Sequence, residues 1–252
     1  MLTAIPTAQL TQVRDGVREG RLQMPLSEAA LLANGVREHR AALVEALGGY
    51  SRLACEAIID AALAERAAQP QAPELVWTGP EGPHTGARDT AVVVRNLFER
   101  ARTEVILGGY CFDAAQQLLA PLHTAMTERG VQATFFINID QPASASTDVA
   151  EHLAAAAKAF VSTTWPFGRP FPALYCDSRA LHPRPYVSMH AKCVVVDRST
   201  AFVSSANFTA RGQTRNIETG VLIQQPSFAA HLANQWLALV ANNLVTKLTP
   251  SV

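Results

Sequence analysis

The chain has 252 residues, of which 48% are hydrophobic and 17% are charged, so it can bury a sizeable core and does not have the composition of a disordered protein. Twenty-one basic residues balance 21 acidic ones, which argues against strong non-specific DNA binding but leaves room for a local basic cleft. No stretch approaches about 18 uninterrupted apolar residues, so we expect a cytoplasmic protein without a membrane partner.

The first 72 residues predict a small helical domain. Apolar residues at helical spacing end at Gly20, and Ser27 is placed to cap a helix through Leu32. Two further helices are expected, at residues 37–47 and from Ser51 onward. This region holds no set of residues typical of chemistry, so its expected role is packing or recruitment of a partner protein.

The remaining chain predicts an α/β domain over residues 73–252, after a linker at residues 69–73. Strands that alternate with helices over short links are typical of βαβ units, so we expect a mixed, largely parallel sheet flanked by helices. The expected strands are residues 75–77, 105–110, 131–139, 173–176, 192–197, 201–204 and 219–223, and the expected helices are residues 91–102, 114–129, 148–161 and 227–243, with caps at Asp89 or Thr90, Asp148 and Ser227.

The segment from residue 186 to residue 223 carries the residues with the clearest chemical potential. His190, Lys192 and Asp197 stand in the pattern H-x-K-x-x-x-x-D, and residues 192–197 predict a buried strand. Alternate side chains on a strand share a face, so the imidazole and the ammonium should point the same way into a cleft. Asp197 ends the strand, where its carboxylate can accept hydrogen bonds from the amides of a turn. This structural role is favoured over a role in chemistry.

Ser205, Asn207 and Glu218 follow this strand and extend the set. An imidazole can attack phosphorus or move a proton, and a neighbouring lysine neutralises phosphate oxygens. Asn207 and Ser205 offer hydrogen-bond donors, although the two could equally form a polar turn. Glu218 could hold one imidazole nitrogen, or could be solvated. The set needs neither a metal site nor a cofactor, so it predicts metal-free phosphoryl transfer through a phosphohistidine.

The pattern His190-x-Lys192-x-x-x-x-Asp197, followed by Ser204-Ser205-x-Asn207, resembles the HKD motif of the phospholipase D superfamily. That motif is usually followed by G-S-x-N, so Ser204 departs from it at the glycine. The segments LVWTGPEG, RDTAVVVRNLFERA, VILGGY and RNIETGVLI also resemble the phospholipase-D-like component of DISARM, a bacterial anti-phage system. The resemblance implies a phospholipase-D-like fold, with His190, Lys192, Asp197 and Glu218 as catalytic residues and Ser205 and Asn207 as substrate-binding residues.

Only one of the seven histidines, His190, stands in an H-x-K pattern. The superfamily's chemistry uses two such histidines, a nucleophile and a proton donor, and simple members obtain the second from a two-fold partner. The resemblance therefore implies a homodimer with a composite site. The alternatives are a second half supplied by another protein, or an inert site.

These observations lead to a metal-independent phosphodiesterase of the nuclease type that acts on nucleic acid, in particular DNA, within a defence system. Two other functions stay open. One is a lipid phosphodiesterase with the same chemistry. The other is a non-catalytic scaffold that grips nucleic acid, or binds other defence-system proteins through its helical region.

Overall fold

A computed structural model describes residues 2–68, 72–80, 86–142 and 144–250. The chain divides into two compact units, Met1–Pro70 and Gln71–Val252, and each is described here by itself. Most of the expected linker falls on residues 69–71, which lie outside the described residues. No helix in the described ranges is both long and apolar enough to cross a membrane.

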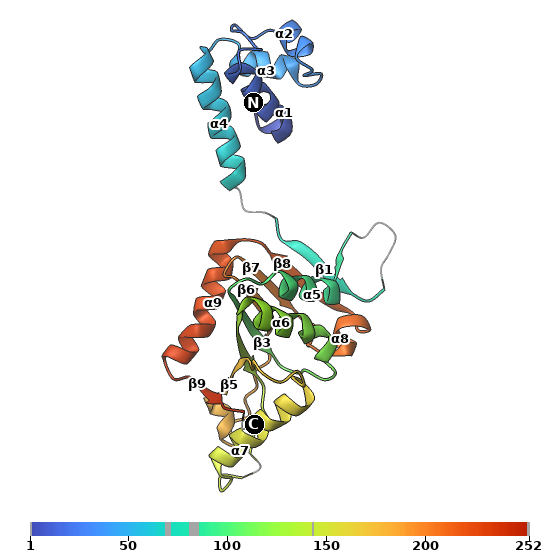
Figure 1. Cartoon of the computed structure of the whole chain (residues 1–252), viewed down its shortest axis with the longest axis vertical. Helices are drawn as coiled ribbons and strands as arrows, with labels where there is room; N and C mark the ends of the chain where they lie inside the picture. Colours follow the sequence, from blue (N-terminus) through green and yellow to red (C-terminus); the bar gives the residue numbers. More distant parts are fainter. Residues whose placement is uncertain (1, 69–71, 81–85, 143, 251–252) are drawn as a thin grey trace. The chain divides into compact units, whose positions relative to one another are not determined.

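The first unit is helical, as its sequence predicts (Figure 1). Its described part contains the short turn η1 (Leu2–Ala4) and the helices α1 (Thr7–Arg18), α2 (Glu28–Ala33), α3 (Arg40–Leu47) and α4 (Arg52–Ala68). Ser27 caps α2, because its hydroxyl oxygen accepts a hydrogen bond from Ala30 N at 3.2 Å. The core is formed by buried apolar side chains that include Leu10, Leu43 and Ile59.

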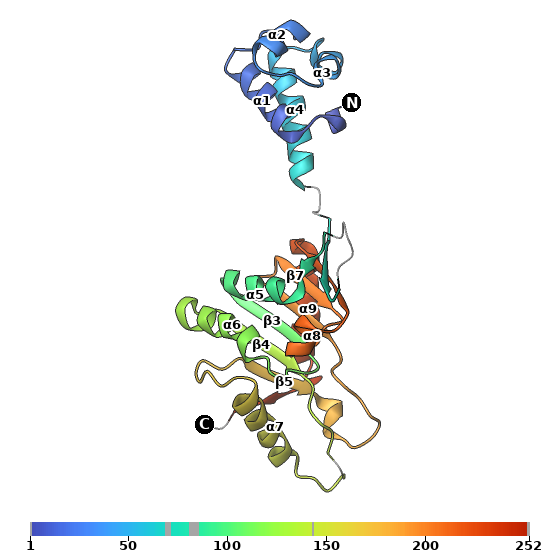
Figure 2. The same cartoon turned by 90° about the vertical axis from the view of Figure 1, so that its right-hand side faces the viewer.

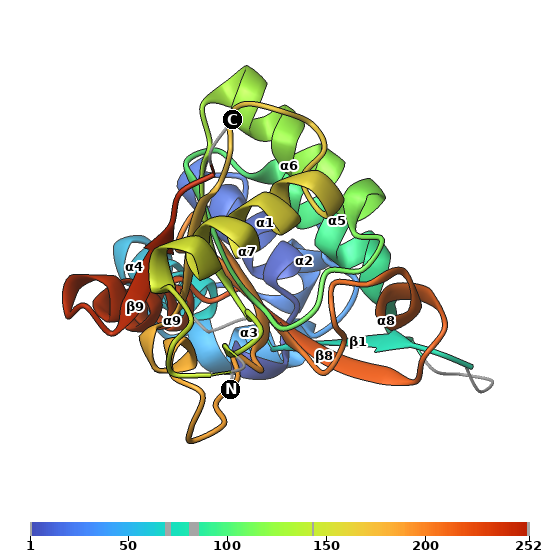
Figure 3. The same cartoon turned by 90° about the horizontal axis from the view of Figure 1, so that it is seen from below.

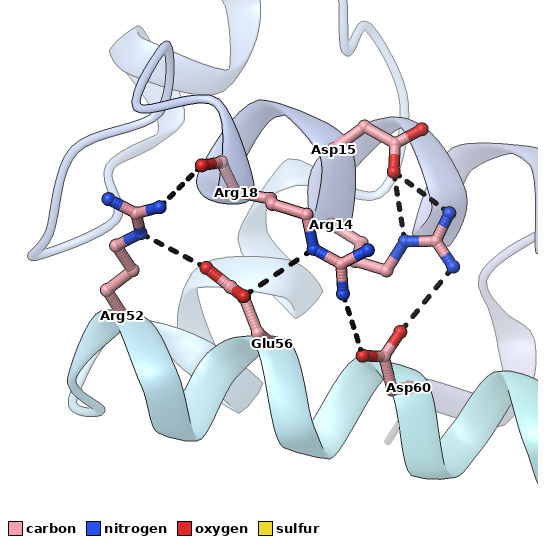
Figure 4. A network of polar contacts seen from close by, with 6 residues as sticks. All are labelled: Arg14, Asp15, Arg18, Arg52, Glu56 and Asp60. Atoms are coloured by element: carbon pink, nitrogen blue, oxygen red, sulfur yellow. Dashed lines mark hydrogen bonds and ion pairs between the residues drawn. The ribbon is translucent and has the colours of Figure 1, made fainter.

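Ion pairs also join α1 to α4 on the surface of this unit (Figure 4). Arg18 contacts Asp60 at 3.0 Å and Glu56 at 3.6 Å, and Arg14 reaches Asp60 at 3.5 Å. Arg52 contacts Glu56 one helical turn away at 3.1 Å. Exposed pairs of this kind contribute about 0–1 kcal/mol each, so the apolar core contributes most of the stability of the first unit.

The second unit is built on one sheet, whose nine described strands have the order β2-β1-β8-β7-β6-β3-β4-β5-β9. The strands are β1 (Glu74–Thr78), β2 (Arg88–Asp89), β3 (Glu104–Gly109), β4 (Gln132–Ile137), β5 (Ala173–Asp177), β6 (Lys192–Val196), β7 (Thr200–Ser204), β8 (Glu218–Ile223) and β9 (Val245–Leu248). The helices are α5 (Thr90–Arg100), α6 (Gln116–Arg129), α7 (Val149–Thr163), α8 (Ala210–Thr214) and α9 (Pro226–Ala241), and a short turn η2 spans Ser178–Leu181.

Helices cover both faces of this sheet, which confirms the mixed α/β class (Figures 2 and 3). Successive side chains of β6 enter two different cores, as the alternation of a strand requires. Val194 packs in the cluster that includes residues of α5, α6 and α7. Val195 packs in a second cluster with Ala229 and Ala233 of α9. The buried strand that carries the motif is therefore sandwiched between helical layers.

The expectation of a largely parallel sheet is wrong. Within the described sheet only β1–β2, β3–β4 and β4–β5 pair in parallel, and the other neighbours are antiparallel. Parallel pairing needs a crossover, which α6 provides between β3 and β4 and α7 between β4 and β5. β6, β7 and β8 instead follow one another as neighbours and pair antiparallel, as short connections permit.

Of the three helix caps expected in the second unit, two are confirmed and one is wrong. Asp89 Oδ1 accepts from Val92 N, and Asp148 Oδ1 accepts from Glu151 N, each at 2.9 Å. Ser227 does not cap the last helix. That helix begins one residue earlier at Pro226, whose fixed φ suits a first helical position, with Gln225 before it. The short elements β2, α8 and β9 are absent from the prediction.

Candidate active site

Several strands of the second unit end at the same edge of the sheet. Lys192, the first residue of β6, pairs with Gly109 at the end of β3. On the other side of β6 the register continues to β7, where Ser204 pairs with Gly220 of β8. Glu218 begins β8 at this same edge. The sheet therefore collects the ends of β3, β6, β7 and β8, and with them most of the predicted site residues, in one place.

His190 and Lys192 are in direct contact there. Lys192 Nζ lies 3.1 Å from Nδ1 and 3.2 Å from Nε2 of His190, and it donates to the backbone oxygen of His190 at 2.8 Å. The imidazole is exposed, whereas Lys192 is buried. Burial lowers the pKa of the Lys192 ammonium, and the negative charge of Glu218 opposes this shift.

Tyr110 completes this contact, although the sequence analysis did not assign it to the site. Its ring centroid lies 4.7 Å from that of His190, and Lys192 Nζ lies 5.3 Å from the Tyr110 centroid. Tyr110 follows Gly109, where a Cβ atom would collide with the rings of Phe112 and Phe208. The glycines of VILGGY could have indicated Tyr110 from the sequence, because they allow the close packing that sets the position of the tyrosine.

The backbone before His190 is held by the end of β4. Asn138 Oδ1 accepts from Met189 N at 3.0 Å, and Asn138 N donates to Gly109 O at 3.3 Å. Asn138 thereby ties the His190 segment to the end of β3. Sequence reasoning missed this residue, since it lies 51 positions from its partner.

Glu218 contacts Ser205 rather than His190. Ser205 Oγ donates to one carboxylate oxygen of Glu218, and Asn216 Nδ2 donates to the other at 3.0 Å. Ser205 Oγ also accepts from Thr219 N at 3.1 Å, which fixes the hydroxyl. Among the described residues no hydrogen bond joins Glu218 to His190. The structure thus brings Glu218 to the site. There its carboxylate affects the charge of Lys192 and does not orient the imidazole of His190.

Asn207 lies in the turn after β7, with a buried side-chain oxygen that has no partner within the described residues. Its backbone oxygen accepts from Gln213 Nε2 at 2.8 Å. Ser204, which stands where the family pattern has glycine, stabilises this turn, because its Oγ accepts from Ala206 N at 3.0 Å and donates to Thr219 O at 3.2 Å. A buried polar atom without a partner is costly, so the Asn207 side-chain oxygen retains the capacity to accept a hydrogen bond.

Asp197 lies at the opposite end of β6, about 16 Å from Lys192 at the usual rise of a strand. Its carboxylate accepts from Arg102 N at 2.9 Å, from Thr103 N and Oγ1 at 2.8 Å each, and from Glu104 N at 3.0 Å. These bonds fasten the start of β3 to the end of β6. The structure therefore does not bring Asp197 to the candidate active site and gives it a structural role.

We expect Asp197→Asn to lower the free energy of unfolding by about 2–3 kcal/mol at pH 7, because a neutral amide accepts these hydrogen bonds less well. Burial alone raises the pKa of Asp197, but the bonds from Thr103, Glu104 and Arg102 outweigh burial and hold the pKa below its usual value. Such a carboxyl stabilises the fold above its unfolded pKa of about 3.9 and loses this contribution as the pH falls through the lower folded pKa.

Urea unfolding of both proteins at several pH values would measure the effect. The difference in the free energy of unfolding between wild type and Asp197→Asn should have its full size at pH 5 to 7 and should disappear below about pH 4. A gap that is unchanged at low pH would contradict the role of the charged carboxylate. Loss of activity in fully folded Asp197→Asn would contradict the structural assignment.

A cleft of about 570 Å³ adjoins this site between the ends of β3 and β4 and helix α7. We call it the α7 cleft, and Tyr110 belongs both to its lining and to the contact with His190. In the described part of the chain, no three His, Cys, Asp or Glu side chains are grouped so that they could hold a metal ion.

The family model described as the PLD-like domain of cardiolipin synthase matches residues 94–239, more than half of the chain. The DISARM protein DrmC of Bacillus paralicheniformis is 27% identical over 179 residues, which cover 69% of this chain and 66% of that relative. The match thus spans slightly less than two thirds of the relative. It agrees with the resemblance to the DISARM component.

Two solved structures resemble the chain at low identity. The first, Nuc from Salmonella typhimurium, a phospholipase D family member, is 22% identical with a TM-score of 0.47, and covers 73% of this chain and 100% of its own. The second, NucT from Helicobacter pylori, is 13% identical with a TM-score of 0.48, and covers 70% of this chain and 98% of its own.

Proposed function

Because the chain belongs to the phospholipase-D-like family, we propose that it is a metal-independent phosphodiesterase of a bacterial defence system, and that it cleaves nucleic acid, in particular DNA. The observation that carries the proposal is the contact of an exposed imidazole, His190, with a buried ammonium, Lys192, at the edge of the sheet. Similarity to a DISARM protein supports the defence role, and we propose that the protein acts in the cytoplasm.

In the proposed reaction, an imidazole nitrogen of His190 attacks phosphorus, and the bond from phosphorus to the leaving oxygen breaks. The leaving oxygen takes a proton from a second histidine. Water then attacks the phosphohistidine, gives a proton back to that second histidine, and releases the product phosphate monoester and free His190. Lys192 neutralises the charge of the phosphate oxygens, Asn207 Nδ2 donates a hydrogen bond to one of them, and Glu218, held by Ser205, favours the charged form of Lys192.

One imidazole cannot act as nucleophile and proton donor in the same step, because the two roles need opposite protonation states. We propose that the second histidine is His190 of another copy, placed across a two-fold axis. The single H-x-K pattern and the exposure of His190 support this arrangement. The alternative is a histidine supplied by another defence-system protein, recruited through the helical first unit.

The dimer can be tested by mixing wild-type subunits with His190→Ala subunits under conditions that allow exchange. In an equal mixture about one quarter of the dimers hold two histidines, so activity should fall to about one quarter of that of undiluted wild type. Dilution with albumin in place of the variant is the control and should leave about one half. One half in both mixtures would exclude a composite site.

A comparison of substrates distinguishes the nuclease, the lipid phosphodiesterase and the non-catalytic scaffold. Single-stranded DNA, double-stranded DNA and phosphatidylcholine vesicles should be compared at equal phosphodiester concentration, with and without a chelator. We expect cleavage of DNA, retained in the chelator, and no release of choline. Preferred cleavage of phosphatidylcholine would establish the lipid phosphodiesterase. DNA binding without turnover, equal in wild type and His190→Ala, would establish the scaffold.

A further inference from the structure

The α7 cleft lies where a ligand held at His190 would extend. In α/β sheets ligands bind outside the carboxyl ends of the strands, and this cleft is formed by the segments that follow β3 and β4. Tyr110 connects the two places, because its ring contacts His190 on one side and lines the cleft on the other. A phosphodiester at His190 therefore has space beside it for one of its substituents.

The wall of the cleft is shaped by small and apolar side chains. Helix α7 contributes Ala155, Ala156 and Ala159, whose short side chains leave the space open. Phe112 and Phe160 also line it but are nearly fully buried, so Tyr110 is the partly exposed one among the Phe and Tyr side chains of the described lining. This combination suits one flat ring that stacks on Tyr110 and lies against the alanines.

The charges of the lining select what can enter. Asp113 and Asp140 are exposed, and the lining contains no Lys or Arg among the residues that the structure describes. His152 Nε2 is engaged with the backbone oxygen of Asp140 at 2.7 Å. A lining with two carboxylates disfavours a second phosphate and favours groups that donate hydrogen bonds. Adenine, cytosine and guanine each offer an exocyclic amine with two such hydrogens, whereas thymine has no exocyclic amine and offers only its ring N3–H.

We propose that the α7 cleft binds the base next to the scissile phosphate, with a preference for bases that carry an exocyclic amine. This inference rests on the proposed function and names a specificity site for it. A quaternary ammonium headgroup would also carry the right charge, but such groups are held best by several aromatic faces. The single accessible face at Tyr110 favours a base.

Ala155→Phe fills the cleft, and Ala154→Phe is its matched control. Both alanines are exposed residues of α7, but Ala154 does not line the cleft. Rates should be measured on a short oligonucleotide and on the same oligonucleotide with abasic sites beside each phosphate, a diester that has no flat ring to place in the cleft. We expect Ala155→Phe to lower the ratio of the two rates at least about tenfold, and Ala154→Phe to leave it unchanged. An unchanged ratio in both variants would overturn the proposal.

The binding of an oligonucleotide that contains 2-aminopurine decides the matter even without turnover. Stacking in the cleft should quench its fluorescence in wild type and Ala154→Phe but not in Ala155→Phe. Equal quenching in all three proteins would overturn the proposal. Wild type that cleaves neither diester but shows this quenching pattern would reject the proposed chemistry and retain the base site. Impaired choline release in Ala155→Phe alone would assign the cleft to a lipid headgroup instead.

The carboxylates predict the preference among bases. In the double variant Asp113→Asn and Asp140→Asn, the preference for cytosine over thymine beside the cleaved bond should shrink at least about threefold, because an amide can also donate to thymine oxygens. A preference that is absent in wild type, or unchanged in the variant, would contradict the assignment of these carboxylates.

Discussion

Replacement of His190 by alanine should lower the rate of phosphodiester hydrolysis by at least about 10⁴-fold, because it removes the attacking atom. In a composite dimer the same change also removes the proton donor, so little activity should remain. The imidazole is exposed, so its loss leaves no large cavity in either core. Stability should consequently change little, and circular dichroism and thermal unfolding would verify this.

His231→Ala is the matched control, because His231 is also exposed but lies on α9. It should retain full activity on DNA. Mass spectrometry of quenched wild-type reactions should find a phosphoryl group that still carries its nucleotide on His190, and no adduct should form in His190→Ala. Full activity in His190→Ala would defeat the proposed function. Activity that vanishes with a chelator would defeat its metal-independent form.

The sequence predicted the elements of the second unit well but not the directions of their strands. The composition of runs such as residues 105–110 and 192–197 predicts buried strands. Asp89 and Asp148 predict the starts of helices. Nothing in a strand's own residues states which neighbour it will join. β6 enters the sheet beside β3 in the antiparallel sense, a choice made by long-range packing that short-range patterns do not encode.

The candidate active site was predicted as a set of residue types, and the structure adds their positions. The H-x-K spacing led directly to the contact of His190 with Lys192. The same motif suggested Asp197, which lies at the far end of the strand and bonds to backbone amides. Tyr110 was missed because it reaches the site from the end of β3, which is remote in sequence from His190. Asn216 lies only two residues before Glu218 and was missed because spacing along the chain does not show that its amide faces that carboxylate.

Lys192→Met should lower the rate of hydrolysis by about 10²–10³-fold, the range seen when one preorganised charge at a reacting group is removed. Methionine keeps much of the buried hydrocarbon chain, so the change tests the charge rather than the packing. The decrease should appear in kcat for DNA and for bis(4-nitrophenyl) phosphate alike, because Lys192 acts at the phosphate. A loss confined to KM would reduce Lys192 to a binding residue.

Glu218→Gln tests whether Glu218 helps to keep Lys192 protonated. Glu218 acts on Lys192 and need not touch the substrate. Burial lowers the pKa of Lys192 and the Glu218 carboxylate opposes this shift, so the neutral variant should lower that pKa further. A cation with a lower pKa loses its proton at lower pH. The alkaline limb of the pH–rate profile should therefore move to lower pH in Glu218→Gln, with the rate preserved on the acid side. A uniform loss of rate at every pH would instead place Glu218 in the chemical step itself.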